Sequence, residues 1–146
     1  MTAQSIILSL PWPPDELHPN KAVRLHWSVK AKARRMYREQ VGWIAKEEVY
    51  HPPGQRVGNI RILPFNPPVI AQVTFFVPDR RRRDTDNLMT SLKAAWDGIV
   101  DAGILKDDSS DLLHHETPIV QYRPADKFEV QIILTELLYN SRRYDV

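Results

Sequence analysis

The sequence of 146 residues predicts a small α+β protein, with strands and helices following one another in the order β-α-β-α-β-β. Three observations support this fold class. A short apolar run at residues 6–10 is stopped by prolines, which cannot donate to a sheet ladder. Residues 69–77 alternate with the period of a strand, and two longer segments have helical spacing. A chain of this length fits one domain, residues 1–138, followed by a charged tail at 139–146.

Composition excludes several classes of protein. The chain has no cysteine, which rules out disulfides and zinc sites built on cysteine. No apolar run approaches the roughly 20 residues of a membrane span, and residues 1–10 do not resemble a signal peptide. We therefore expect a cytoplasmic protein with no membrane partner. The net charge is only +2, but cationic residues gather at 30–38 and 80–83 while acids gather at 97–111, as suits phosphate and metal binding.

Four strands are expected, at residues 6–10, 69–77, 118–122 and 128–134. The second is predicted to be central in its sheet, because both of its faces are partly apolar. The preceding connection, residues 51–68, contains many prolines and glycines and has room for a short strand at 60–63.

The first helix is expected from Ser28, as N-cap, to about Val49. Its predicted apolar face consists of Val29, Ala33, Met36, Tyr37, Val41, Ile44 and Val49. Its cationic residues are Lys30, Lys32, Arg34, Arg35 and Arg38. These cations form either a solvated helix face or a surface that contacts the DNA backbone, and the sequence leaves both interpretations open.

The second helix is expected from about Asn87 to Ala102, where Gly103 suits the position after a helix end. Its buried stripe is predicted to be Leu88, Leu92, Ala95, Trp96 and Ile99. A polar face is predicted to carry Asp86, Thr90, Lys93 and Asp97. On a continuous helix Lys93 would lie about 10 Å along the axis from Asp86.

The most unusual stretch joins a run of arginines to two carboxylates. The run is Arg80, Arg81, Arg82 and Arg83, and it is followed by Asp84 and Asp86. If the backbone is extended, side chains at positions i and i+2 point the same way, so both carboxylates can bind one divalent cation. Arginines meet phosphate oxygens through paired hydrogen bonds. The stretch therefore predicts a metal-dependent site that acts on a phosphodiester.

A nuclease site needs carboxylates that converge from different elements, and the pair Asp107-Asp108 is the natural second source. The alternative for this pair is an acidic loop or helix cap. A rival metal site is offered by His114-His115-Glu116, but adjacent residues on a strand point to opposite faces. His18 and His26 are interpreted as structural.

These motifs resemble the RusA family of Holliday junction resolvases, particularly its phage-type members. The resemblance rests on Leu10-Pro11-Trp12-Pro13-Pro14, on the stretch from Pro78 to Leu88, and on the two segments Lys93–Asp97 and Ala102–Asp108. It implies a small domain with a mixed sheet and two helices. It also implies a homodimeric endonuclease, bacterial or phage-encoded, that uses Mg²⁺, or Mn²⁺ in its place, to nick two opposed strands of branched, four-way DNA.

The resemblance implies that Asp84, Asp86 and Asp108 are the catalytic carboxylates and metal ligands. The family pattern places a functional lysine four residues after the second carboxylate, but Thr90 occupies that position here. Either three residues are inserted and Lys93 takes the role, or an arginine substitutes; we favour Lys93 because Ala-Ala-aromatic-Asp follows it. Two alternatives are a catalytically silent junction-binding protein and a metal-dependent nuclease acting on flaps or other branched DNA.

Overall fold

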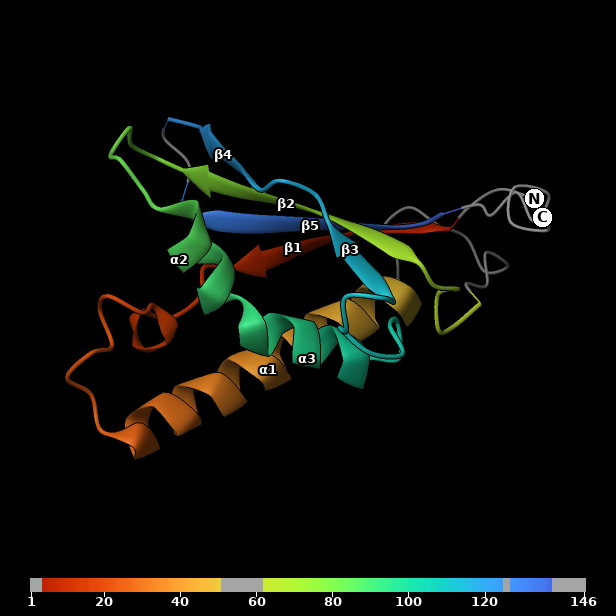
Figure 1. The fold of residues 1–146 in the computed structure, drawn as a ribbon, viewed down its shortest axis with the longest axis horizontal. Helices are drawn as coiled ribbons and strands as arrows, with labels where there is room; N and C mark the ends of the chain where they lie inside the picture. The colour runs from red at the N-terminus through yellow and green to blue at the C-terminus, as the bar shows by residue number, and fades with distance from the viewer. Residues whose placement is uncertain (1–3, 51–61, 125–126, 138–146) are drawn as a thin grey trace.

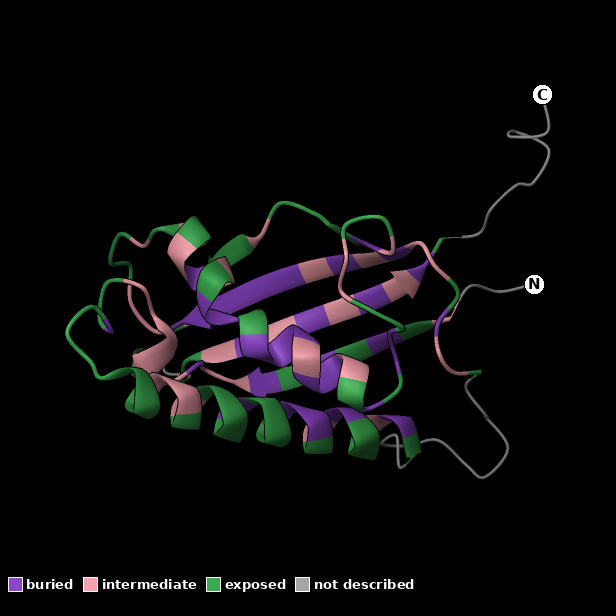
Figure 2. Ribbon diagram, turned by 60° about the horizontal axis from the view of Figure 1, so that its bottom comes forward, coloured by how far each residue is buried: buried purple, intermediate pink, exposed green. Residues whose placement is uncertain are grey.

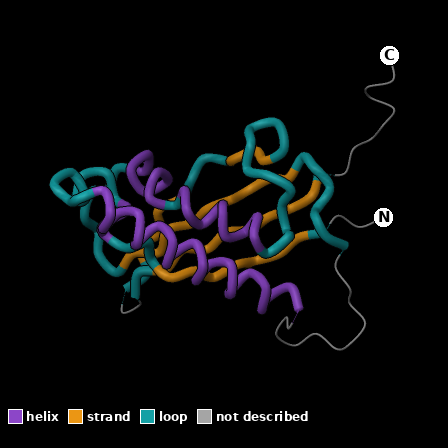
Figure 3. Tube along the Cα trace, turned by 90° about the horizontal axis from the view of Figure 1, so that it is seen from below, coloured by secondary structure: helices purple, strands orange, loops and turns teal. Residues whose placement is uncertain are grey.

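A computed structural model describes residues 4–50, 62–124 and 127–137. Its strands form one sheet, and its helices lie on one face of that sheet (Figures 1 and 3). The elements in chain order are β1 (Ser5–Pro11), the short helix η1 (Asp15–Leu17), α1 (Trp27–Tyr50), β2 (Val69–Val77), α2 (Thr85–Ser91), α3 (Lys93–Asp101), β3 (Leu113–His115), β4 (Ile119–Tyr122) and β5 (Glu129–Glu136).

The sheet is mixed, as predicted. Its order is β1-β5-β2-β3, and β4 also pairs with β2. β5 is antiparallel to both of its neighbours, whereas β3 and β4 run parallel to β2. β3 pairs with the first residues of β2 and β4 with its last, so together they form one interrupted edge strand. The α+β class, the four predicted strands and the central place of β2 are confirmed.

The core lies between the sheet and the helices. Alternate residues of β1, β2 and β5 face it, because side chains of a strand alternate between its two faces. In β1 and β5 these buried residues are Ile6, Leu8, Leu10, Val130, Ile132 and Leu134. All five residues of the predicted stripe on the second helix are buried as well.

α1 begins at Trp27, one residue before the expected N-cap. The carbonyl of His26 accepts the first helical hydrogen bond, from the N–H of Val29 at 3.1 Å. The Nδ1 atom of His26 also accepts from the N–H of Ser28, at 3.2 Å. His26 therefore takes the capping position that the sequence assigned to Ser28.

The predicted apolar face of α1 is only partly right. Tyr37, Val41 and Val49 are buried, but Val29 and Met36 are 43% and 57% exposed. The first turns of α1 extend past α3 and lie beside η1 and the segment of Trp12 and Pro14, which cover this face only in part (Figure 2). Helical spacing alone does not show where the packing partner ends.

α1 and α3 pack closely because each has a glycine at the contact. A Cβ atom added to Gly98 would lie 2.5 Å from the carbonyl oxygen of Arg38, which no side chain tolerates. Beside this contact Arg38 forms a bidentate ion pair with Asp101, with N–O distances of 2.6 and 2.8 Å. The Arg38 guanidinium lowers the pKa of the Asp101 carboxyl.

The predicted second helix is broken at Leu92 into α2 and α3. The hydroxyl of Thr90 donates to the carbonyl of Asp86 at 2.9 Å, and that of Ser91 donates to the carbonyl of Leu88 at 2.6 Å. Such side-chain bonds compete with the backbone donors of the next turn and favour a break. The helical face expected to run from Asp86 through Lys93 is therefore interrupted.

Two predictions concern segments that lie wholly or partly outside the described residues. The possible strand at 60–63 lies half outside the described residues, and 62–63 are not in a strand. The tail at 139–146 lies wholly outside them. Among the described helices, none is long and apolar enough to cross a bilayer.

Candidate active site

Asp84 stands at the junction between the arginine loop and α2, at the carboxyl end of β2. Its backbone is extended, with φ −88° and ψ 113°, and it is the N-cap of α2. Its Oδ1 atom accepts from the N–H groups of Asp86 at 2.9 Å and Asn87 at 3.4 Å. These bonds hold one carboxylate oxygen and leave the other available for a ligand.

Asp86 lies in the first turn of α2, and its side chain is exposed. The backbone across Asp84 and Asp86 is therefore not extended throughout, as the sequence argument assumed. The cap brings the backbone N–H of Asp86 to 2.9 Å from the Asp84 carboxylate, so the two residues lie together at the start of α2. The second helix also begins earlier than predicted, at Thr85.

Arg83 is turned inward and holds the loop. Its guanidinium pairs with Asp79 at 2.8 Å and donates to the carbonyls of Asp79 and Arg81. It also lies over the ring of Phe128, at 5.3 Å from the centroid. The N–H of Arg81 and the Arg83 guanidinium lower the pKa of Asp79. Arg83 therefore orders the loop, although the sequence predicted only DNA contact for it.

The other three arginines of the run are exposed. Arg80 lies over the ring of Tyr122 in β4, at 4.5 Å from the centroid. The side chains of Arg81 and Arg82 form no ion pair with any described residue. These two guanidinium groups are the ones that remain available for phosphate.

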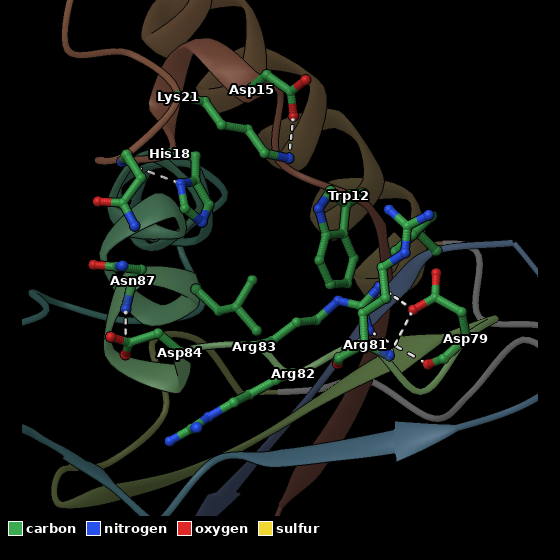
Figure 4. A pocket seen from close by; sticks show the side chains of 13 residues that line it. Trp12, Asp15, His18, Lys21, Asp79, Arg81, Arg82, Arg83, Asp84 and Asn87 are labelled. Atoms are coloured by element: carbon green, nitrogen blue, oxygen red, sulfur yellow. Dashed lines mark hydrogen bonds and ion pairs between the residues drawn. The ribbon is translucent and has the colours of Figure 1, made fainter.

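A cavity of about 540 Å³ opens beside Asp84. Four segments supply its wall: residues 12–21, the arginine loop, the start of α2 and Phe128, just before β5 (Figure 4). The first segment contributes Trp12, Asp15, His18 and Lys21, which the sequence analysis did not assign to the site. The only sequence signal for them was the position of the proline-rich stretch after β1, which does not show where the loop returns.

Asp108 lies near the other end of β2. Asp108 lies close enough to His115 for its charge to raise the pKa of that side chain. His115 in turn pairs with Ala71, near the start of β2. Val77, at the other end, is six residues further on, or about 20 Å at 3.3 Å per residue. The sequence predicted that the Asp107-Asp108 turn would fold back toward Asp84. It does not, because α2 and α3 together run back along the sheet.

The three predicted metal ligands therefore do not meet in one chain. No group of three or more histidine, aspartate or glutamate side chains in the described ranges is placed to hold a metal ion. The same result applies to the rival site: His114, His115 and Glu116 are not placed to hold a metal ion together. His115 instead packs against the edge of Trp96, at 4.7 Å between ring centroids, and burial lowers its pKa.

Lys93 is exposed at the start of α3, immediately after the break at Leu92. If Lys93 takes the role of the family lysine, the three added residues fall in the segment that contains this break. Thr90, at the position of the family lysine, bonds to the backbone instead. The role of Lys93 stays a prediction.

The cationic residues predicted on α1 divide into two kinds. Lys32, Arg34 and Arg35 are exposed, and Lys30 is partly exposed. They lie on the turns of α1 that reach the same end of the molecule as α2 (Figures 1 and 2). Arg38 is committed to Asp101, so a contact with DNA would have to compete with that pair.

The chemistry of the carboxyl end of β2 fits a divalent cation such as Mg²⁺. Mg²⁺ sites commonly use one or two carboxylates, with water and substrate phosphate as the remaining ligands. Asp84 has one oxygen outside its cap, and Asp86 has no hydrogen-bonded side-chain partner among the described residues. These two would hold the ion, next to Arg81 and Arg82.

Comparison with known proteins identifies the family. No family model matches the chain. The crossover junction endodeoxyribonuclease RusA of Enterobacteria phage 82 and that of Escherichia coli K12 are each 33% identical over 104 residues, 70% of this chain and 72% of theirs. An uncharacterized protein of Xylella fastidiosa is 31% identical over 130 residues, 88% of this chain and 74% of its own. The chain thus belongs to the RusA family of crossover junction endodeoxyribonucleases.

Proposed function

We propose that the chain is a Mg²⁺-dependent endonuclease that resolves four-way DNA junctions by paired, symmetric nicks. The observation that carries this proposal is the pair Asp84 and Asp86 at the start of α2, beside Arg81 and Arg82, which form no ion pair with a described residue, in a chain that resembles RusA. Mn²⁺ is expected to replace Mg²⁺, since both prefer oxygen ligands.

The residues at this end of the sheet have separate roles in phosphodiester hydrolysis. Asp84 and Asp86 bind and orient the cation. When bound, Mg²⁺ polarises the phosphate and lowers the pKa of the water that attacks it. Arg81 and Arg82 offset the charge that develops on the phosphate oxygens, and Lys93 is a further source of positive charge. The exposed cations of α1 follow the DNA backbone on either side of the cut.

Asp108 reaches the ion from the second subunit of a homodimer. The separation along β2 within one chain favours this arrangement over a triad made by one subunit. β4 offers a contact surface, because it lies at the sheet edge with all four residues exposed, including Ile119 and Tyr122. A two-fold axis perpendicular to the sheet at the middle of the β3–β4 edge would set the two β2 strands antiparallel, with the carboxyl end of one beside the amino end of the other. The same symmetry matches two opposed strands of a junction.

The test compares a synthetic four-way junction with linear duplex and flap substrates, each with Mg²⁺, with Mn²⁺ and without divalent metal. Paired symmetric nicks on the junction alone support the proposal. Binding without cleavage under either metal would instead make the chain a catalytically silent junction-binding protein. Faster cutting of flaps would make it a nuclease of other branched DNA.

A further inference from the structure

The cavity beside Asp84 is larger than one phosphate group requires. Its volume of about 540 Å³ falls within the range of pockets that enclose small organic molecules, roughly 300–1,000 Å³. Its wall combines an aromatic ring, Trp12, with the polar side chains of His18 and Asn87 (Figure 4). We infer that this cavity binds an unstacked nucleotide next to the phosphate that is cut, with the base against Trp12. The inference rests on the proposed function and adds the position of a substrate base.

Trp12 is held in a fixed position. It lies between prolines in the sequence, and the carbonyl of Pro11 accepts a hydrogen bond from the hydroxyl of Tyr37 at 2.8 Å. The indole packs edge-on against Phe75, at 5.6 Å between centroids, and against Phe128 at 4.9 Å. A base that stacks on it meets a preordered surface, and stacking of a base on an aromatic side chain tolerates any base.

His18 supplies a hydrogen-bond donor at the same cavity. Its Nδ1 atom accepts from the N–H of Asn20 at 3.2 Å, so a neutral ring carries its proton on Nε2. Nε2 makes no hydrogen bond to a described residue. With the amide of Asn87, this N–H is placed to distinguish the polar edges of different bases.

The charges around the cavity favour a nucleotide within a DNA strand. Lys21 neutralises Asp15 at 3.0 Å, and Arg83 neutralises Asp79 at 2.8 Å. Arg81 and Arg82 remain for the phosphates on either side of the base. Removing a base from its stack costs less where its pairing is weakened, and a base pair at a branch point opens more readily than one inside a continuous duplex. The cavity thus favours a junction over a continuous duplex.

The experiment uses the Asp86→Asn protein, which is expected to bind junctions without cutting them. Junctions carry 5-iodouracil at one position at a time around the cut, because ultraviolet light crosslinks this base to an aromatic ring that stacks on it. We expect a crosslink to Trp12 at one position. Adding Trp12→Leu should remove the crosslink and weaken binding about tenfold, whereas Trp12→Phe should keep most of both. Trp43→Ala is the matched control, because Trp43 is 72% exposed on α1 and does not line the cavity.

His18→Ala gives a second test that leaves the core untouched. On a junction whose branch point can migrate, the wild-type protein should prefer certain sequences, and His18→Ala should flatten that preference. The absence of a crosslink to Trp12 at every position, with junction binding intact, would overturn the cavity inference and leave the proposed function standing. A wild-type protein that neither binds nor cuts junctions would overturn both.

Discussion

The two ends of β2 differ in how completely one chain assembles them. At the carboxyl end Asp84 caps α2, Arg83 is locked to Asp79, and a cavity opens beside them. At the amino end Asp108 lies near His115, far from the other carboxylates. The first group is positioned by hydrogen bonds between residues close in sequence. The position of Asp108 depends on the turn before β3, which is distant in sequence from β2. In our proposal its metal site also depends on a second subunit.

The largest expected effect is at the carboxyl end. Asp86→Asn should reduce junction cleavage by at least about a thousand-fold, because a charged metal ligand worth several kcal/mol of transition-state stabilisation is lost. Junction binding should be kept or improved, since one negative charge near phosphate is removed. Single-turnover cleavage and gel-shift binding measure the two effects. Asp111→Asn, an exposed acid outside the predicted site, is the control. Normal cutting by Asp86→Asn would contradict the metal site.

The amino end is tested by mixing two inactive proteins. Asp108→Asn should also abolish cleavage, although Asp108 lies near His115, whose partner Ala71 is at the opposite end of β2 from Asp84. If each site takes Asp108 from the other subunit, a mixed dimer of Asp86→Asn and Asp108→Asn has one site with both carboxylates intact. Activity should therefore return on mixing, in the form of single nicks. Two inactive proteins that stay inactive after subunit exchange would place all the ligands in one chain.

Several features at the carboxyl end followed from the sequence. The strand at 69–77 was predicted with the bounds of β2, and the arginines and Asp84 directly follow it. The fold class and the buried stripe of the second helix were also predictable, because period and composition determine them. What failed depended on long-range geometry. Spacing cannot show that Leu92 breaks a helix, that Val29 stays partly exposed beside η1, or that the turn at Asp108 lies beside β3.

The arginine run should divide by function. Arg83→Ala removes the pair with Asp79 and should lower the urea concentration at the midpoint of unfolding. Arg82→Ala should leave that midpoint unchanged. It should instead reduce the slope of log binding constant against log salt concentration by about one, since one phosphate contact is lost. Salt titrations of binding and urea unfolding of both variants measure this division. Equal effects of the two substitutions on stability would show that Arg83 does not order the loop.

Asp84 is expected to have two roles that different substitutions separate. Both Asp84→Asn and Asp84→Ala should abolish cleavage. Only Asp84→Ala loses the helix cap, because asparagine caps helices about as well as aspartate, and it should lower the free energy of unfolding by about 1 kcal/mol. Thermal and urea unfolding without divalent metal measure the difference. Equal stability of the two variants would contradict the capping role.

The smallest expected effect is a pH dependence of stability at the amino end of β2, where His115 lies. Partial desolvation beside Trp96 lowers the pKa of His115 below its ordinary value of 6.5, although much of the side chain is exposed, and the charge of Asp108 opposes that shift in part. As pH falls below about 6.5, the unfolded chain takes up a proton that the folded chain does not, so the free energy of unfolding decreases. His115→Phe keeps an aromatic contact with Trp96 without the titration, and its stability should change less between pH 7.5 and 5. Urea unfolding in EDTA measures this, with His114→Gln, an exposed neighbour, as control. The same pH dependence in His115→Phe as in the wild-type protein would show that another group causes it.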